Sequence, residues 1–278
     1  MPNPSQIMKD KIVSKLKEVE KEEKVTILYA VESGSRGWGF ASKDSDYDVR
    51  FIYIHSLDWY LSIAERRDVI EYPRSNQLDM SGWDVKKVLQ LFNKSNPPLY
   101  EWLTSPIVYI ERGSFAQRLR LLMPSFYAPI SCLHHYLHMA KGNYREYLRG
   151  EKVRVKKYFY VLRPILACMW IATRKTMPPM EFAQLLHGQK LDKKLADEIE
   201  RLLKRKRAGE ELDMEERIAI INKFLEGKIK YFEGYVKTLK DDKIEQDQIL
   251  DDLFRDILKE QYGLLINSYT AGKTKLTL

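Results

Sequence analysis

The chain has 278 residues, of which 44% are hydrophobic and 31% are charged, so it is long enough for a sizeable core and most consistent with two domains. It contains no run of about 20 apolar residues and no apolar core near its N-terminus, which argues against a membrane protein and a secretory signal. The net charge of +8 favours a phosphate-bearing partner, and two cysteines without a CxxC pair fit a reducing cytoplasm.

The first part of the chain, residues 1–125, predicts an α/β domain. Apolar residues recur on one helical face from 5 to 22, and a β-branched strand follows at 25–31. The segment 47–54 alternates apolar and polar residues, which is typical of a second strand. The remaining predicted elements are short strands at 69–72 and 77–80, helices at 81–92 and 99–103, and a strand at 107–110.

The second part, residues 126–278, predicts an all-helical domain, so the expected fold class is α+β with a mixed sheet. Segments of helical periodicity cover 130–149, 153–174, 179–186, 190–207, 214–239 and 246–261. The basic run 204–207 predicts a solvated helix end. His134, His135 and His138 predict a packed helix face in preference to a zinc site, because no carboxylate nearby completes a ligand set.

The stretch GSRGWGFASKDSDYDVR, residues 34–50, carries the strongest functional signal. Asp46 and Asp48 are two residues apart at the start of a strand, so their side chains point to the same face. Two carboxylates on one face repel each other unless a cation neutralises them, and magnesium prefers such oxygen ligands. A third carboxylate is expected from a neighbouring strand. Asp79 fits this role better than Asp84, which is expected in the first turn of the next helix.

A glycine turn precedes these acids. Gly34 allows the backbone to approach a phosphate closely, and Ser35 offers a hydroxyl and an N–H group to it. Arg36 is placed to contact either a phosphate or the aspartates, and the sequence leaves both open. The glycine spacing matches neither the Walker pattern nor the dinucleotide fingerprint.

At these residues the chain resembles the DNA polymerase beta-like nucleotidyltransferase superfamily, whose pattern is a Gly-Ser pair followed by Asp-apolar-Asp-apolar. Gly34–Ser35 and the DYDV segment at 46–49 match that pattern. The longer string from 34 to 53 resembles one branch, the predicted nucleotidyltransferases linked to RNA repair. The stretches 79–84, 96–103 and 156–164 resemble it too, so the resemblance covers about residues 25–185.

The resemblance implies a role for each matching residue. Asp46, Asp48 and Asp79 would bind Mg²⁺ or Mn²⁺, and Asp79 would help to deprotonate the acceptor hydroxyl. Gly34 and Ser35 would hold the triphosphate. The helical half resembles the nucleotide-covering domain of kanamycin-type nucleotidyltransferases, which implies that Lys157, Tyr158 and Arg163 reach the phosphate or the base of the nucleotide.

The predicted function is therefore metal-dependent transfer of a nucleoside monophosphate from an NTP such as ATP to a hydroxyl acceptor, with release of pyrophosphate. An RNA end is one candidate acceptor. The alternative is a non-catalytic nucleotide- or RNA-binding module of the same fold. The acceptor, the preferred base, the oligomeric state and the role of residues 186–278 stay open, and a cytoplasmic location without membrane contact is expected.

Overall fold

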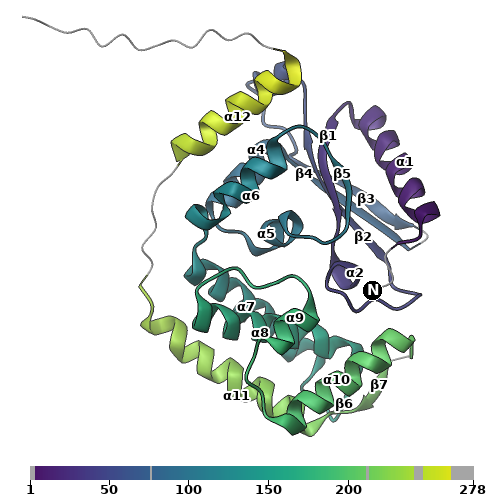
Figure 1. Ribbon diagram of the computed structural model, residues 1–278, viewed down its shortest axis with the longest axis vertical. Helices are drawn as coiled ribbons and strands as arrows, with labels where there is room; N and C mark the ends of the chain where they lie inside the picture. The colour runs from purple at the N-terminus through teal and green to yellow at the C-terminus, as the bar shows by residue number, and fades with distance from the viewer. Residues whose placement is uncertain (1–3, 76, 211–212, 241–246, 264–278) are drawn as a thin grey trace, which may run out of the picture.

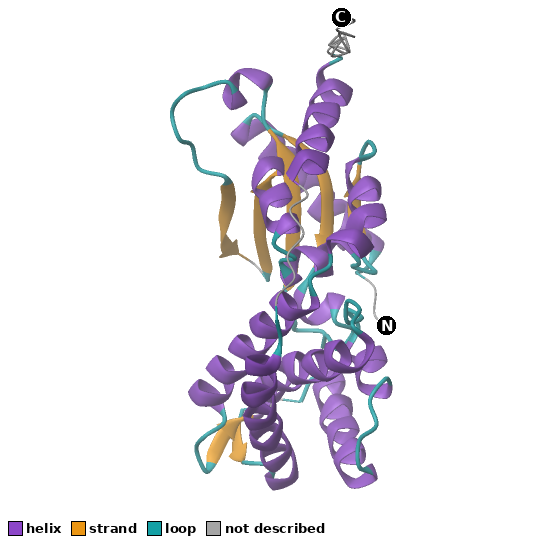
Figure 2. Cartoon of the chain, turned by 90° about the vertical axis from the view of Figure 1, so that its left-hand side faces the viewer, coloured by secondary structure: helices purple, strands orange, loops and turns teal. Residues whose placement is uncertain are grey.

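The computed structural model describes residues 4–75, 77–210, 213–240 and 247–263, and these form a sheet half and a helical half (Figures 1 and 2). A five-stranded sheet in the order β3-β4-β2-β1-β5 fills the upper half of Figure 2, and the helical half carries a small two-stranded sheet. The predicted α+β class with a mixed sheet is confirmed. Among the described helices, none is both long and apolar enough to cross a membrane.

The direction of the strands decides which residues meet at the edge of the large sheet. Its strands are β1 (Thr26–Glu32), β2 (Tyr47–Ile54), β3 (Val69–Ser75), β4 (Leu78–Asp84) and β5 (Val108–Glu111). The β2–β4 pair is parallel, whereas β1–β2, β1–β5 and β3–β4 are antiparallel. The starts of β2 and β4 therefore lie beside the end of β1.

Helices cover both faces of this sheet. The helix α1 (Gln6–Glu23) packs its buried residues against one face, with Ile12, Leu16 and Val19 in a cluster with strand side chains. The other face is covered by α4 (Val85–Asn93), α5 (Pro97–Leu103), α6 (Phe115–Phe126) and α12 (Asp247–Tyr262), and short helices follow β1 and β2 at α2 (Gly34–Gly37) and α3 (Leu57–Tyr60).

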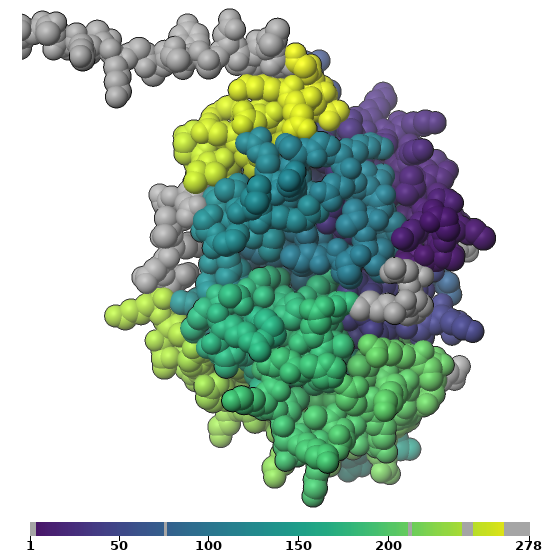
Figure 3. Space-filling model, in the orientation of Figure 1, coloured from purple at the N-terminus to yellow at the C-terminus, as the bar shows by residue number. Residues whose placement is uncertain are grey.

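The helix α12 returns to the sheet half, although the sequence analysis placed it with residues 126–278. Figure 3 shows it lying on the surface of that half. Asp256 forms an ion pair of 3.0 Å with Arg118 of α6, and Ser114 donates a hydrogen bond of 2.7 Å to Glu260. The apolar stripe of α12 predicts a helix over 246–261, but it does not indicate which of the two cores this helix packs against. Gln246, the first residue of that predicted helix, lies outside the described residues.

The helical half has its own core and two short strands that the sequence analysis predicted as helix. Its elements are α7 (Pro129–Tyr147), β6 (Lys152–Arg154), η1 (Val155–Lys157), α8 (Tyr158–Arg174), α9 (Phe182–His187), α10 (Lys193–Ala208), β7 (Met214–Glu216), α11 (Ala219–Tyr235) and η2 (Val236–Thr238). Val153 and Val155 are buried while their neighbours are exposed, so this stretch follows the period of two that a strand requires.

A buried ion pair joins the two halves. The Arg163 guanidinium on α8 lies 2.8 Å from the Glu101 carboxylate on α5. Tyr136 of α7 donates a hydrogen bond of 2.7 Å to the same carboxylate, and the indole of Trp38, directly after α2, donates one of 3.3 Å. The arrangement ties the segment after the glycine turn to helices of both halves.

Candidate active site

The turn after β1 lies directly against β2, at the edge of the sheet that faces the helical half (Figure 1). Gly34 has a φ of +52°, a backbone conformation that favours glycine. A Cβ atom at this position would lie 1.8 Å from Oδ2 of Asp48, so no larger residue fits without moving that carboxylate. The N–H group of Ser33 also donates to the carbonyl of Asp48 at 2.8 Å. The glycine therefore brings main chain and carboxylate into contact.

The three aspartates of the predicted site meet at this edge. Asp48 and Asp79 are direct partners in the parallel β2–β4 register. The Arg50 guanidinium bridges them, with Nη2 at 3.4 Å from Asp48 and 3.2 Å from Asp79. Asp46, just before β2, forms an ion pair with Arg74 of β3. Each carboxylate is thus paired with a positive side chain.

The charge balance favours an additional cation. Burial raises the pKa of Asp48, Arg50 opposes this shift, and the negative charges of Asp79 and Asp46 raise the pKa further. The ionised form of Asp48 is therefore disfavoured by its surroundings despite the adjacent guanidinium. A divalent cation among the three carboxylates would remove this cost.

The donor set has the chemistry of a magnesium site, but arginine side chains are bound to it. Carboxylate oxygens are the ligands that Mg²⁺ prefers. Among the residues that the structure describes, no three or more acidic, histidine or cysteine side chains are arranged to hold a metal ion. Because Arg50 and Arg74 contact all three carboxylates, a metal ion would have to take their place.

Arg36 contacts neither the aspartate carboxylates nor solvent to any extent. Its side chain is 6% exposed and donates to the carbonyls of Ser45 at 2.6 Å and Asp46 at 3.1 Å. The guanidinium also lies 3.8 Å from the ring centroid of Tyr47. Arg36 therefore shapes the loop that leads into β2, and its predicted contact with phosphate remains a prediction.

The two other residues assigned to nucleotide binding lie differently. The half-buried Ser35 has no hydrogen bond to its hydroxyl among the described residues, so this group is free to bind a phosphate oxygen. The ammonium group of Lys157 lies over the rings of Tyr147 and Tyr160, at 4.2 and 4.7 Å from their centroids. Burial lowers the pKa of Lys157, with a further contribution from the neighbouring Lys156.

Asp84 is held at the other end of β4. It is the N-cap of α4, accepting a hydrogen bond of 2.8 Å from the N–H group of Lys86, and it accepts a second bond of 2.7 Å from Tyr60. Burial raises its pKa to about 6. The strand β4 continues to this residue, so α4 begins at Val85 and not at 81. Of the two rival aspartates, the structure brings Asp79 to Asp48.

Glu32, at the end of β1, is part of the site and was missed by the sequence analysis. Its buried carboxylate accepts a hydrogen bond of 2.9 Å from the N–H group of Asp48 and another from the Tyr109 hydroxyl. Burial raises the pKa of Glu32 to about 7, although both hydrogen bonds act against the shift. An acidic residue closing an otherwise apolar strand just before the glycine turn was the signal for it.

Basic and aromatic side chains of the helical half face the aspartates. The end of α10 lies on the loop before β2, where Arg207 donates a bond of 2.9 Å to the carbonyl of Gly39. Burial and Lys156 lower the pKa of Lys206, while the charges of Asp44 and Asp46 oppose this. Of the basic run 204–207, predicted as a solvated helix end, Lys206 and Arg207 thus reach the loop before β2. Lys204 is exposed as predicted, and Arg205 pairs with Glu210 and Glu215.

Tyr160 of α8 is the aromatic residue on the same side. It is 42% exposed and packs edge-on against Trp38, with ring centroids 6.1 Å apart. Burial raises its pKa, and the charges of Asp48 and Asp46 add to the shift. Its sequence context, a helix of core-spaced apolar residues, gave no sign that one aromatic ring would point to the carboxylates.

The chain is similar to known proteins and matches one family model. The chain is 49% identical over 253 residues to an uncharacterized protein, YcgL, of Bacillus subtilis strain 168. The matched region covers 91% of this chain and 97% of that protein. A solved nucleotidyltransferase-like protein from Exiguobacterium sibiricum 255-15 matches with a TM-score of 0.33 and 13% identity, over 91% of this chain and 92% of that one. The family model described as the RNA repair pathway DNA polymerase beta family matches residues 8–256, which include both halves. The chain therefore belongs to the RNA repair pathway DNA polymerase beta family.

Proposed function

We propose that the protein is a metal-dependent nucleotidyltransferase that moves a nucleoside monophosphate from an NTP to a hydroxyl acceptor and releases pyrophosphate. The observation that carries this proposal is the direct pairing of Asp48 with Asp79 beside the backbone of Gly34. Membership of a polymerase beta family supports the transferase class. The net charge of +8 and the family description both favour an RNA end as the acceptor.

In this proposal Asp46, Asp48 and Asp79 hold the divalent cations, Mg²⁺ or Mn²⁺. Bound cations would neutralise the phosphate oxygens and increase the acidity of the acceptor hydroxyl. The acceptor oxygen forms a bond to the α-phosphorus, the bond from that phosphorus to pyrophosphate breaks, and Asp79 receives the acceptor proton. Glu32 acts as a positioning residue, because it fixes the backbone at Asp48.

The remaining residues bind and orient the nucleotide. The free hydroxyl of Ser35 would donate to a phosphate oxygen, and Gly34 keeps side chains away from the triphosphate. Lys206 would balance the charge of the pyrophosphate from the helical side, since its electrostatic interactions reach Asp44 and Asp46. Lys157, whose ammonium group lies over the ring of Tyr160, would add positive charge on the same side.

One observation favours a second candidate function, a nucleotide-binding module without catalysis. Arg50 and Arg74 neutralise the aspartates, as a protein that binds no metal would require. The two functions differ in turnover and not in nucleotide affinity. A test of the proposal therefore has to measure both.

The experiment incubates the protein with each α-labelled NTP, Mg²⁺ or Mn²⁺, and total RNA, and follows label transfer and pyrophosphate. Asp48→Asn and Asp79→Asn are each expected to lower the rate at least about 100-fold, since even changes to residues behind the ligands cost about 10–100-fold. Asp58→Asn, at an exposed site in α3, is the control. Wild-type rates in the Asp48 variant would refute the mechanism. NTP binding with no pyrophosphate formed would favour the binding module.

A further inference from the structure

The two arginines that neutralise the aspartates are held in different ways. Arg50 lies in β2, and its side chain is 19% exposed. It donates to the main-chain carbonyls of Val49 at 3.1 Å and Asp79 at 3.2 Å, and it also bridges the carboxylates of Asp48 and Asp79. Because main-chain carbonyls stay in place when a carboxylate changes its partner, Arg50 is a fixed part of the strand pair β2–β4.

Arg74 is bound to the site through one group. It lies near the end of β3, an edge strand of the sheet, and its side chain is 66% exposed. Within the described part of the chain, the Asp46 carboxylate is the one hydrogen-bond and ion-pair partner of its guanidinium. An ion pair this exposed contributes little free energy, because water competes for both groups. Arg74 can therefore leave Asp46 without a change in the fold.

The charges of the aspartates keep Arg74 in this place. The hydrogen bond with Asp46 raises the pKa of Arg74, and the charges of Asp46, Asp48 and Asp79 add to the shift. All three carboxylates therefore attract the guanidinium. A divalent cation among them would reverse this balance, since it would neutralise the carboxylates and repel Arg74 at short distance.

A guanidinium released from Asp46 would still be near the helical half. Burial raises the pKa of Tyr160 on α8, and the charge of Arg74 opposes this shift, so Arg74 is close enough to act on a ring of that half. A guanidinium is planar and donates two parallel hydrogen bonds to a phosphate group, which makes arginine well suited to this anion. A substrate phosphate group that enters between the two halves would therefore be the next partner of Arg74.

We propose that Arg74 is an exchangeable counterion of the site, which pairs with Asp46 in the metal-free protein and with a substrate phosphate group once a metal ion has replaced it. This inference rests on the proposed nucleotidyl transfer and adds a substrate-binding residue to it. The phosphate group belongs either to the NTP or to the backbone of an RNA acceptor. Arg50 stays on β2 and β4 in both states.

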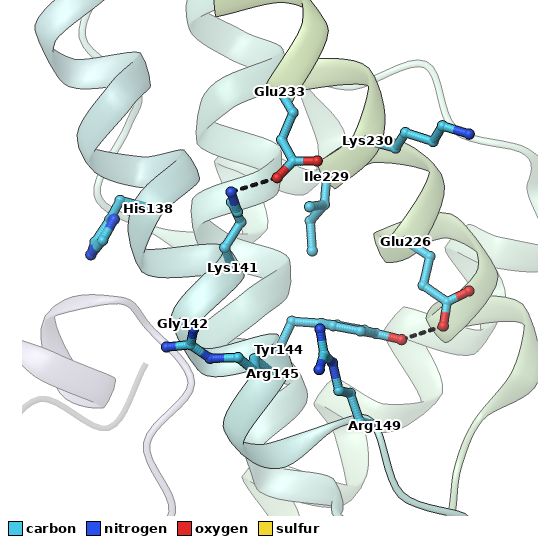
Figure 4. Close-up of a pocket in the computed structure, with 10 residues that line it drawn as sticks. All are labelled: His138, Lys141, Gly142, Tyr144, Arg145, Arg149, Glu226, Ile229, Lys230 and Glu233. Atoms are coloured by element: carbon cyan, nitrogen blue, oxygen red, sulfur yellow. Dashed lines mark hydrogen bonds and ion pairs between the residues drawn. The ribbon is translucent and has the colours of Figure 1, made fainter.

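The first test measures the binding of Mn²⁺ to the full chain without nucleotide, by electron paramagnetic resonance. Arg74→Ala should bind Mn²⁺ roughly 5-fold more tightly than the wild type, because no exposed ion pair has to be broken first. Arg145→Ala is the matched control. It removes the same charge from an exposed position of α7, in a pocket between α7 and α11 on the side away from α2 (Figures 1 and 4).

A double variant shows whether the ion binds at the aspartates. Asp46→Asn should weaken Mn²⁺ binding, and adding Arg74→Ala to it should bring no further change, because the ion pair is already lost. Equal Mn²⁺ affinities in Arg74→Ala and the wild type would overturn the exchange. An equal gain in Arg145→Ala would also overturn it, since the effect would then follow from net charge.

The second test measures nucleotidyl transfer at saturating Mn²⁺ and separates the two sources of phosphate. Arg74→Ala should raise one KM at least about 10-fold, as the loss of a hydrogen bond between charged groups predicts. A higher KM for the NTP assigns Arg74 to the triphosphate, and a higher KM for RNA assigns it to the acceptor. Arg74→Lys should recover part of the loss, because it keeps the charge. Unchanged KM values for both substrates would overturn the phosphate contact.

The Mn²⁺ measurement distinguishes a failure of this inference from a failure of the proposed function. Tighter Mn²⁺ binding by Arg74→Ala, with no transfer by the wild type, would support the exchange and contradict the transferase. NTP and RNA affinities would then take the place of the KM values. Transfer by the wild type with equal Mn²⁺ affinities would contradict the exchange alone. Mn²⁺ binding by neither protein would overturn both.

Discussion

Glu32→Gln tests whether ionisation of the buried Glu32 carboxylate, which accepts a hydrogen bond from the N–H group of Asp48, lowers the stability of the folded protein. The Gln side chain can still accept from the N–H group of Asp48 and can donate to the Tyr109 hydroxyl. It therefore resembles the protonated form of Glu32, which keeps the hydrogen bonds without the charge. Any difference between the two proteins that changes with pH then reports the ionisation of this one group.

The sign follows from the raised pKa of Glu32. Burial raises this pKa from 4.5 to about 7, so the folded state holds a proton that the unfolded state has already lost. The free energy of unfolding of the wild type therefore falls as the pH rises from about 4.5 to 7 and levels off above that. A shift of this size corresponds to roughly 3 kcal/mol. Glu32→Gln does not undergo this loss. Between pH 4.5 and 8, its free energy of unfolding should therefore increase by roughly 3 kcal/mol relative to that of the wild type.

The assay compares the melting temperatures of the two proteins from pH 4.5 to 8. At about 2 to 4 °C per kcal/mol, the relative gain of Glu32→Gln is several degrees. Glu111→Gln on β5 is the control, because an ion pair with Arg120 lowers the pKa of Glu111. Its effect should stay constant above about pH 5.5, where Glu111 is ionised in the folded and the unfolded protein. Parallel pH curves for Glu32→Gln and the wild type would refute the reasoning.

Two further substitutions test the glycine turn and the contact between the halves. Gly34→Ala should cost at least about 1 kcal/mol from its positive φ and abolish transfer by displacing the Asp48 carboxylate, as melting and pyrophosphate assays would show. Gly227→Ala, in open space on α11, should instead stabilise by about 0.5–1 kcal/mol. Arg163→Met should destabilise by about 3–5 kcal/mol in a melting experiment, because it leaves Glu101 buried and unpaired. Adding Glu101→Gln should restore most of this loss, and no recovery would contradict the ion-pair account.

The sequence predicts the strands of the site well because their side-chain pattern is local. The alternation of 47–54 yields β2 with the bounds that the structure shows, and it places Asp48 on a defined face. The proximity of Asp48 to Gly34 follows from the same stretch, since β1 and β2 are antiparallel neighbours joined by the turn. Asp79 could be selected over Asp84 because apolar residues surround it, which is typical of a strand.

Long-range packing explains what the sequence could not predict. The stripe of α12 fits either core equally, so its return to the sheet half depends on partners such as Arg118 that lie far away in the chain. The end of α10 looks like a solvated helix end until the two halves meet. Tyr160 likewise gains its place near the aspartates only from tertiary structure. Both α10 and Tyr160 belong to the helical half, where the periodicity of the sequence predicts the helices but not their tertiary contacts.

The arginines of the site show that a local sequence motif predicts the metal ligands more readily than it predicts the net charge around them. Two aspartates on one strand face need a cation, and this reasoning led from sequence to a metal site. In the fold, Arg50 shares the face of Asp48 by the same period of two and supplies part of that charge from within the motif. Arg74 does the same for Asp46 from β3, the next strand in the chain, which β4 separates from β2 in the sheet. Metal binding at these carboxylates therefore replaces an arginine guanidinium by a metal ion. Its free energy is the difference between the interaction of the carboxylates with the metal and their interaction with the arginines.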